Sequence, residues 1–192
     1  MSTQKIQSII ESSIAVKQQY VADPAFLEKI NKAVTLVASA FKDGFKVQFC
    51  GNGGSAADAQ HLAAEFSGRF YKNRKALPSD ALHCNSSYLT AVANDYSYDD
   101  IYSRLVEGTM YKGDVLVGIS TSGNSGNIVK AFEMAKSMGI VTIGFTGAAG
   151  GKMSELSDVL INVPSTDTPR IQESHILIGH IICELVEAQL FA

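Results

Sequence analysis

The chain has 192 residues, of which 46% are hydrophobic and 18% are charged, and its formal net charge is −3. This length suits one domain with its own core, and the composition excludes a disordered chain. The negative charge argues against general binding of nucleic acid, which needs a basic surface, and no apolar run reaches the roughly 18 residues of a membrane span.

The cysteines indicate the compartment. Cys50, Cys84 and Cys183 show no CxxC spacing and cannot all pair within one chain. We interpret them as free thiols of a reducing compartment. The first residues also lack the apolar core of a secretory signal. We therefore expect a cytoplasmic protein with no membrane partner.

Two stretches of helical periodicity open the chain. The first covers about Gln4–Tyr20, and the second starts at Asp23, which can cap a helix, with Pro24 suited to its first turn. Gly44 is expected to end this second helix. These N-terminal helices, residues 1–44, have no obvious place beside the strands that follow, so we expect them at an oligomer interface.

Five short apolar segments then alternate with helical stretches. The predicted strands are Lys46–Cys50, Asp80–Cys84, Asp114–Ser120, Val141–Thr146 and Val159–Val163. The predicted helices are Ser55–Phe66, Ser86–Asn94, Ser125–Met138 and a long one over about Pro169–Phe191. Such alternation predicts an α/β fold, a doubly wound five-stranded parallel sheet with additional N-terminal helices. We find no internal repeat or linker and expect one domain over residues 1–192.

The most informative motif is the glycine-rich segment Gly51–Ser55, which follows the first predicted strand and leads into a helix. Glycines let a ligand approach the backbone, and the N–H groups of a helix N-terminus bind anions. A simpler interpretation is a turn closed by a capping box of Ser55 and Asp58. A dinucleotide site is disfavoured because His83–Asn85 ends the second strand where an acidic residue is needed, and Gly147–Lys152 resembles a P-loop only in composition.

A second segment of the same kind follows the third predicted strand. Four hydroxyl residues lie within six positions before the next helix: Ser120, Thr121, Ser122 and Ser125. Capping a helix needs one or two hydroxyls rather than four. Hydroxyls together with helix-end amides solvate a phosphate without needing a cation, so this segment predicts a phosphate site.

Histidines supply the candidates for acid–base chemistry. His61 and Glu65 stand four residues apart on a predicted helix and therefore share a face. His180 lies in a very apolar helix, where its polar ring needs a partner. His83 is consistent with a strand residue, and His175 is as readily charged or exposed as functional. A phosphate cradle beside these groups indicates chemistry on a phosphorylated small molecule.

With these motifs in place, the chain resembles the phosphoheptose isomerases, which are single-domain members of the sugar-isomerase (SIS) superfamily. The resemblance runs nearly end to end, and its motifs occur in the family's order. They are Cys-Gly-Asn-Gly-Gly-Ser at 50–55, Gln-His-Leu-Ala-Ala-Glu at 60–65, Ala-Asn-Asp at 93–95, Ile-Ser-Thr-Ser-Gly-Asn-Ser at 119–125 and Arg-Ile-Gln-Glu at 170–173. The resemblance implies a flavodoxin-like SIS fold.

The resemblance also implies the activity. Family members convert sedoheptulose 7-phosphate to D-glycero-D-manno-heptose 7-phosphate, the first step of bacterial ADP- or GDP-heptose synthesis for surface polysaccharide such as lipopolysaccharide. It further implies a homotetramer that binds a small phosphosugar as its substrate and does not bind nucleic acid. Because the last helix is apolar around most of its circumference, it is either central to the core or packed against another subunit, and we expect active sites near subunit boundaries, with His180 supplied across one.

Site residues follow from the same resemblance. It implies one zinc ion per subunit, bound by His61, Glu65, Gln172 and His180, although amide ligands such as Gln172 suit harder cations better. It implies phosphate contacts by Ser55, Ser120, Thr121, Ser122 and Ser125. Further substrate-binding residues that it implies are Asn52, Gly53, Gly54, Glu65, Arg69, Asn94, Asp95 and Gln172.

The reaction needs a base beside C1 and C2 and an acid–base group at the two oxygens, because it passes through a cis-enediol. We assign these roles to Glu65 and His180. The first alternative is a non-catalytic SIS domain, either a sugar-phosphate sensor or a protein that associates with a replication initiator, but Glu65 and His180 are both retained and favour catalysis. Another is an isomerase of hexulose or pentose phosphates, against which Arg170–Glu173 and the leading helices favour the heptose enzyme.

Overall fold

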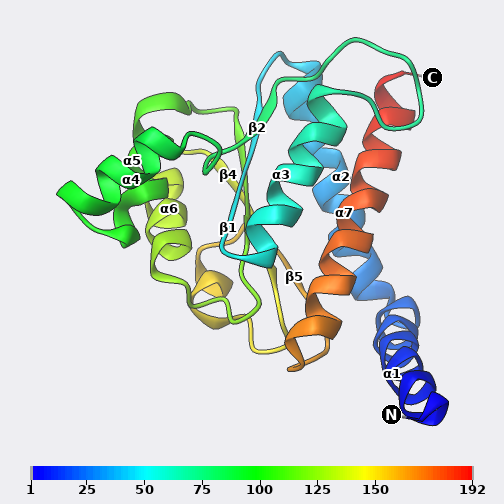
Figure 1. Cartoon of the computed structure of the whole chain (residues 1–192). Helices are drawn as coiled ribbons and strands as arrows, with labels where there is room; N and C mark the ends of the chain where they lie inside the picture. Colours follow the sequence, from blue (N-terminus) through cyan, green and yellow to red (C-terminus); the bar gives the residue numbers. More distant parts are fainter. Residues whose placement is uncertain (1, 192) are drawn as a thin grey trace.

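The computed structural model describes residues 2–191. Within them the chain forms a five-stranded sheet with helices on both faces (Figure 1). The strands are β1 (Val47–Gly51), β2 (Ser79–Ala81), β3 (Val115–Ile119), β4 (Val141–Thr146) and β5 (Val159–Asn162). All neighbouring strands are parallel, in the order β2-β1-β3-β4-β5. The predicted doubly wound sheet is confirmed, and its topological switch point lies between β1 and β3.

Seven α-helices and two 3₁₀ turns occur in the described part of the chain. The helices are α1 (Thr3–Val21), α2 (Pro24–Lys42), α3 (Gly54–Ser67), α4 (Ser86–Asp95), α5 (Ile101–Thr109), α6 (Gly126–Ser137) and α7 (Thr168–Leu190). The turns are η1 (Tyr98–Asp100) and η2 (Gly151–Glu155). In Figure 1, α2, α3 and α7 lie on one face of the sheet, and α4, α5 and α6 lie on the other.

Most boundaries match the sequence prediction, with two corrections. Gly44 ends the second helix as expected, with φ +84°. The second strand stops at Ala81, so His83 lies beyond it rather than within it. Helix α5 was not predicted, because it has only nine residues and follows α4 and η1 without a clear break in the sequence.

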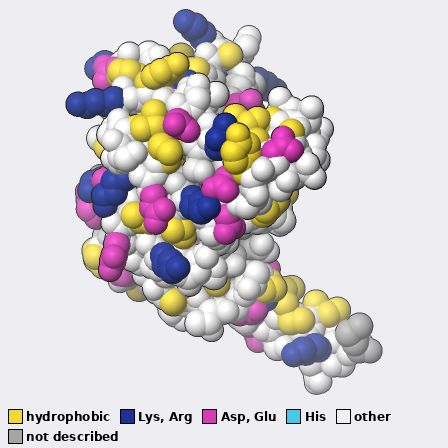
Figure 2. All heavy atoms as spheres, turned by 90° about the vertical axis from the view of Figure 1, so that its left-hand side faces the viewer, with side chains coloured by type: hydrophobic (Ala, Val, Ile, Leu, Met, Phe, Trp, Pro, Cys, Tyr) yellow, Lys and Arg dark blue, Asp and Glu magenta, His cyan; other side chains and the backbone are white. Residues whose placement is uncertain are grey.

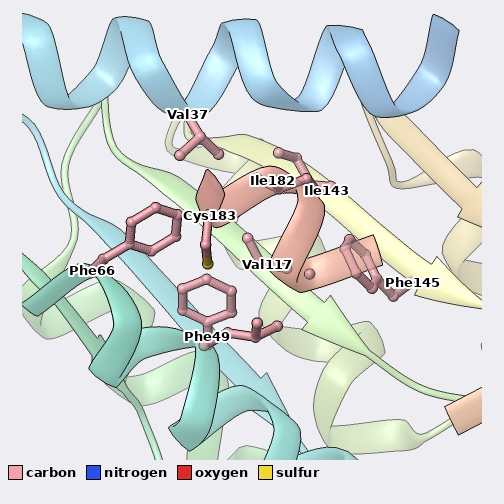
Figure 3. A pocket seen from close by; sticks show the side chains of 10 residues that line it. Val37, Phe49, Phe66, Val117, Ile143, Phe145, Ile182 and Cys183 are labelled. Carbon is pink, nitrogen blue, oxygen red and sulfur yellow. The ribbon is translucent and has the colours of Figure 1, made fainter. Parts of the chain in front are cut away.

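The sheet is buried on both faces, which explains its continuous apolar strands. All five residues of β3 are buried, and they divide between two cores. Val117 packs on the side of α2, α3 and α7, whereas Leu116 packs on the side of α5 and α6. The first core contains a cavity of about 10 Å³, lined by apolar side chains such as Phe49 and Cys183 (Figure 3). This cavity has room for about one water molecule and is too small to hold a substrate.

Helix α1 departs from the rest of the molecule. Its C-terminal part is anchored by the buried Val16 and Tyr20. Its N-terminal part projects from the body (Figures 1 and 2) and carries four exposed isoleucines, Ile6, Ile9, Ile10 and Ile14. Even so, none of the helices in the described residues combines the length and hydropathy needed to cross a membrane.

Candidate active site

The first glycine-rich loop follows β1 and begins α3. Gly53 adopts φ +56°, a conformation that favours glycine. A side chain at Gly51 would approach the carbonyl oxygen of Ser55 to 2.4 Å, so this position also needs glycine. The predicted capping box is wrong, because α3 begins at Gly54 without a side-chain cap and Ser55 is buried in its first turn. The backbone itself therefore shapes this loop.

The second loop joins β3 to α6 and carries the predicted hydroxyls. Ser120 Oγ and Ser125 Oγ lie 2.9 Å apart. Ser125 precedes α6 but makes no side-chain cap to it. Ser122 Oγ accepts a hydrogen bond from the backbone N–H of Asn124 at 3.1 Å, and Gly123 turns the chain with φ +66°. Two hydroxyls are thus gathered at the N-terminus of a twelve-residue helix, an arrangement suited to an anion.

A pair of side-chain amides connects the two loops. Asn52 Nδ2 donates to Asn127 Oδ1 and Asn127 Nδ2 donates to Asn52 Oδ1, both at 2.9 Å. The hydroxyl of Tyr98 also donates to Asn52 Oδ1, at 3.2 Å. Asn127 is only 1% exposed. Sequence reasoning identified Asn52 but missed Asn127 and Tyr98, since the one available signal was a polar residue at an apolar position of a helix.

The acid–base candidates converge between α3 and α7. His61 Nε2 lies 3.0 Å from His180 Nε2 and 3.4 Å from Glu65 Oε1. One nitrogen or oxygen atom from each of these three residues lies within 4.8 Å of the others. The expectation that His180 is supplied across a subunit boundary is wrong, because it meets His61 and Glu65 within its own chain.

A close approach of the two helices creates this convergence. Gly179 on α7 faces Leu62 on α3, and a side chain at Gly179 would come within 2.5 Å of a Leu62 methyl group. Each of these residues is adjacent in sequence to one of the two histidines. The absence of a side chain at Gly179 therefore lets His61 and His180 come together.

The three side chains fit a zinc ion. Zn–N bonds of 2.0–2.1 Å in tetrahedral geometry place two ligand atoms about 3.3 Å apart. The distances from His61 Nε2 to His180 Nε2 and to Glu65 Oε1, 3.0 and 3.4 Å, agree with this value. Two imidazoles and one carboxylate are also a donor set that zinc enzymes use. Gln172 lies against Gly54, where a side chain would come within 2.8 Å of its Nε2 atom, so it borders the first loop.

Three other predicted substrate-binding residues lie at the surface. Asn94 and Asp95 are exposed at the end of α4, and Asn94 Nδ2 donates to Asp95 Oδ1 at 2.9 Å. Arg69 is exposed in the segment after α3. Within residues 2–191, no hydrogen bond joins these three side chains to the His61–Glu65–His180 cluster. Arg69 is adjacent to Phe70, whose ring centroid lies 5.8 Å from that of His180.

Of two further titratable groups on these helices, Asp58 lies near the cluster and His175 packs against β4. Burial raises the pKa of Asp58, while the nearby His61 and His180 act to lower it. His175, considered exposed as readily as functional, is in fact fully buried. Its Nε2 atom lies 3.1 Å from the carbonyl oxygen of Thr146. Burial lowers the pKa of His175 to about 4, so this ring is neutral at pH 7 and is a component of the core.

Comparison with known proteins identifies the family. The SIS domain model matches residues 11–147. The phosphoheptose isomerase of Aneurinibacillus thermoaerophilus is 54% identical over 97% of this chain and 94% of its own length. The chain belongs to the phosphoheptose isomerase family. It is therefore a phosphosugar isomerase, as the sequence motifs predicted.

Solved structures of this family share the fold over their whole length. The phosphoheptose isomerase of Neisseria gonorrhoeae superposes with a TM-score of 0.90 at 40% identity, covering 96% of this chain and 98% of that one. The phosphoheptose isomerase of Francisella tularensis gives a TM-score of 0.92 at 34% identity, covering 98% of this chain and 100% of that one. The SIS fold of this phosphoheptose isomerase family member is thus confirmed.

Proposed function

We propose that the chain converts sedoheptulose 7-phosphate to D-glycero-D-manno-heptose 7-phosphate, the first step of bacterial heptose synthesis for surface polysaccharide. The observation that carries the proposal is the convergence of His61, Glu65 and His180, two of which stand on the helix that begins at the first anion-type loop, a loop that Asn52 and Asn127 join to the second. Relatives named phosphoheptose isomerase support the choice of a seven-carbon substrate. The free cysteines Cys50, Cys84 and Cys183 support a cytoplasmic location.

The proposal includes one zinc ion per subunit. His61, Glu65 and His180 would hold it, with Gln172 as a further ligand by family resemblance. When bound there, zinc supplies a Lewis acid for the carbonyl and hydroxyl oxygens of the substrate. The Glu65 carboxylate has two oxygens, so one can bind metal while the other faces substrate.

The protein's own groups move the protons. Glu65 removes a proton from C1 of the ketose and returns it to C2, which creates and then consumes the cis-enediol. His180 carries a proton between O1 and O2, because the hydroxyl of the ketose lies on C1 and that of the aldose lies on C2. The Nδ1 atom of His180 is left for this transfer, because its Nε2 atom would bind zinc. In the metal-free protein, His61 Nε2, 3.0 Å from His180 Nε2, holds the His180 ring in place.

The hydroxyl loop binds the other end of the substrate. Ser120 and Ser125 donate hydrogen bonds to the phosphate at the N-terminus of α6, together with Thr121 and Ser122. Binding energy gained there orients the reacting carbons at the cluster. The remaining proposed substrate contacts are Ser55, Asn52, Gly53, Gly54, Gln172, Asn94, Asp95 and Arg69.

We also propose that the chain is a homotetramer and that residues 1–44 of its single domain build the interface. Exposed isoleucines on α1 support this, since Ile6 is 57% and Ile10 is 55% exposed. On α7, Leu177 and Leu185 are exposed as well. Such apolar surface on long helices is typical of a subunit interface. Light scattering at micromolar concentration tests it, and a monomer would contradict the assembly.

Turnover of sedoheptulose 7-phosphate, followed by NMR with and without zinc, tests the reaction. Glu65→Gln keeps the shape of the side chain but removes the base, so kcat should fall by about 10²–10⁴-fold. Glu107→Gln on the exposed surface of α5 is the matched control and should leave turnover unchanged. No conversion by the wild-type chain under any metal condition would favour the sugar-phosphate sensor or the replication-associated protein instead.

A further inference from the structure

A buried carboxylate lies on α7 two helical turns beyond His180. Glu187 is only 2% exposed. Its two oxygens accept hydrogen bonds from the backbone N–H groups of Phe70 at 3.2 Å and of Tyr71 and Lys72 at 2.8 Å. The side chain of Arg74 completes the set, with Nε 3.0 Å from Glu187 Oε1. One carboxylate therefore organises the chain segment that follows α3.

The other N–H groups of Arg74 donate hydrogen bonds at the end of α3. Its guanidinium donates to the carbonyl oxygens of Glu65 at 2.7 Å and Phe66 at 2.6 Å. It also donates to those of Gly68 at 3.1 Å and Lys75 at 3.2 Å. The last carbonyls of a helix have no partners within the helix, and a cation placed there is favourable. The arginine thus caps the helix that carries His61 and Glu65.

The same segment contacts the candidate site. The Phe70 ring packs 5.8 Å from the His180 ring and 4.5 Å from the Tyr71 ring, as measured between centroids. Because the backbone N–H groups of Phe70 and Tyr71 are bound to Glu187, the carboxylate fixes where the Phe70 ring lies. The Glu187–Arg74 pair therefore joins the two helices of the cluster and holds the aromatic wall of His180.

The ionisation state of Glu187 is consistent with a rigid Glu187–Arg74 pair. Burial alone raises the pKa of Glu187, but the N–H groups of Lys72, Tyr71 and Phe70 and the Arg74 guanidinium together hold it below its usual range. The carboxylate is thus ionised and fully paired at neutral pH. A buried pair with every hydrogen bond made has one arrangement, and removing one partner leaves the other charge unpaired.

We propose that Glu187 and Arg74 are positioning residues that fix the end of α3 and the 68–75 segment against α7, and thereby set the relative placement of Glu65, His61 and His180. Both side chains are only 3% exposed, so they act through the groups that they bind rather than on substrate. The inference rests on the proposed function for its consequence in catalysis, whereas its structural content can be tested in the metal-free protein.

Two variants and one control test the role. Glu187→Gln keeps the shape but loses the charge, and Arg74→Lys keeps the charge but loses the planar fork of donors. The control is Asp114→Asn, which alters another buried carboxylate. Asp114 accepts backbone hydrogen bonds from Lys46 and Tyr111 where β3 begins, at the opposite end of the strands from the hydroxyl loop.

The first measurement is zinc affinity, by competition with a chromogenic chelator, together with kcat and KM. Both variants should bind zinc about 10- to 100-fold more weakly and lose kcat by a similar factor, while KM for the phosphosugar stays near the wild-type value. Asp114→Asn should lower the melting temperature without changing zinc affinity. Wild-type zinc affinity and kcat in both variants would overturn the proposal, as would an equal loss in Asp114→Asn.

The second measurement uses the metal-free protein and needs no turnover. The ring-proton NMR shifts of His180 report the position of the Phe70 ring, and Phe70→Leu calibrates their change. In Glu187→Gln and Arg74→Lys these shifts should move in the direction seen for Phe70→Leu. Unchanged shifts would overturn the inference, whether or not the wild-type chain binds zinc. Failure of the wild-type chain to bind zinc would count only against the proposed metal centre. If Glu187→Gln does not fold, Arg74→Lys decides the matter alone.

Discussion

At one end of the candidate site, His61, Glu65 and His180 come from two long helices, whereas at the other end Ser120 and Ser125 come from one short loop. The helix-borne cluster depends on packing at Leu62 and Gly179, outside the cluster itself. The hydroxyl loop is shaped by its own backbone turns and by hydrogen bonds to the segment after β4, where the N–H of Gly147 donates to the Thr121 carbonyl at 2.9 Å and that of Met153 donates to the Gly123 carbonyl at 3.1 Å. A substitution in the packing between α3 and α7 should therefore damage catalysis at the first end, whereas phosphate binding at the second end should respond to changes in the hydroxyl loop and in the groups that hold it.

Among changes outside the proposed catalytic groups, the largest effect should come from Gly179→Ala. The new methyl group collides with Leu62 at about 2.5 Å and pushes α7 away from α3. Displacement of His180 by a fraction of an ångström to one ångström should lower kcat about 100-fold. The free energy of unfolding should fall by about 1–3 kcal/mol. Steady-state kinetics and denaturant unfolding measure both quantities.

Two controls separate position from stability. Leu62→Ala in the Gly179→Ala background removes the collision, so kcat should recover although the double variant loses further stability. Gly108→Ala on α5 adds a methyl group where nothing lies within 4 Å, and it should leave kcat unchanged. If the double variant were as inactive as Gly179→Ala alone, helix separation would not be the cause.

A smaller effect is expected at the hydroxyl loop. Ser120→Ala or Ser125→Ala removes one hydrogen bond to the phosphate, and hydrogen bonds to charged groups contribute about 1.5–3 kcal/mol. KM for the phosphosugar should therefore rise about 10- to 100-fold with kcat changed less. Ser137→Ala, at the far end of the same helix α6, is the control with unchanged KM. An unchanged KM in both loop variants would place the phosphate elsewhere.

The same contrast explains what the sequence could predict. The approach of Glu65 to His61 follows from their spacing on one helix, and the hydroxyl loop follows from local composition. The approach of His180 to His61 depends on the small size of Gly179 opposite Leu62, a contact between residues more than a hundred positions apart. Such tertiary pairs leave no periodic pattern in one sequence.

Other features escaped prediction for the same reason. Arg74 and Glu187 look like ordinary surface charges until the fold buries them together. Asn127 looks like an ordinary polar residue in the first turn of a helix until it pairs with Asn52. Elements with strong local signals, four of the five strands and the long helices, were predicted nearly to the residue, whereas the end of β2 was misplaced by three residues and the nine-residue helix α5 was not predicted.

A double-mutant cycle on Asn52 and Asn127 tests the connection between the loops. Each single change to Ala leaves a buried or half-buried amide unpaired, so the free energy of unfolding should show a coupling of about 1 kcal/mol between the two sites. Asn94 and Asp95, also joined by a side-chain hydrogen bond but exposed, provide the control cycle with coupling near zero. Additive losses at Asn52 and Asn127 would contradict a connection that stabilises both loops.

The last prediction concerns the contribution of His175 to the pH dependence of the free energy of unfolding. This contribution does not vary near neutral pH and appears as the pH is lowered. The pKa of this buried ring is lowered from 6.5 to about 4, so between these pH values the unfolded chain binds a proton that the folded chain does not. The free energy of unfolding should therefore fall as the pH drops from about 6.5 to 4, by about 3 kcal/mol from this group, and below that the contribution stays constant. His175→Gln has no such titration, and its stability should lose that part of the slope. Because every other titratable group is common to both proteins, the difference between the two pH profiles isolates His175. Identical profiles would mean that His175 is protonated equally in the folded and unfolded chains.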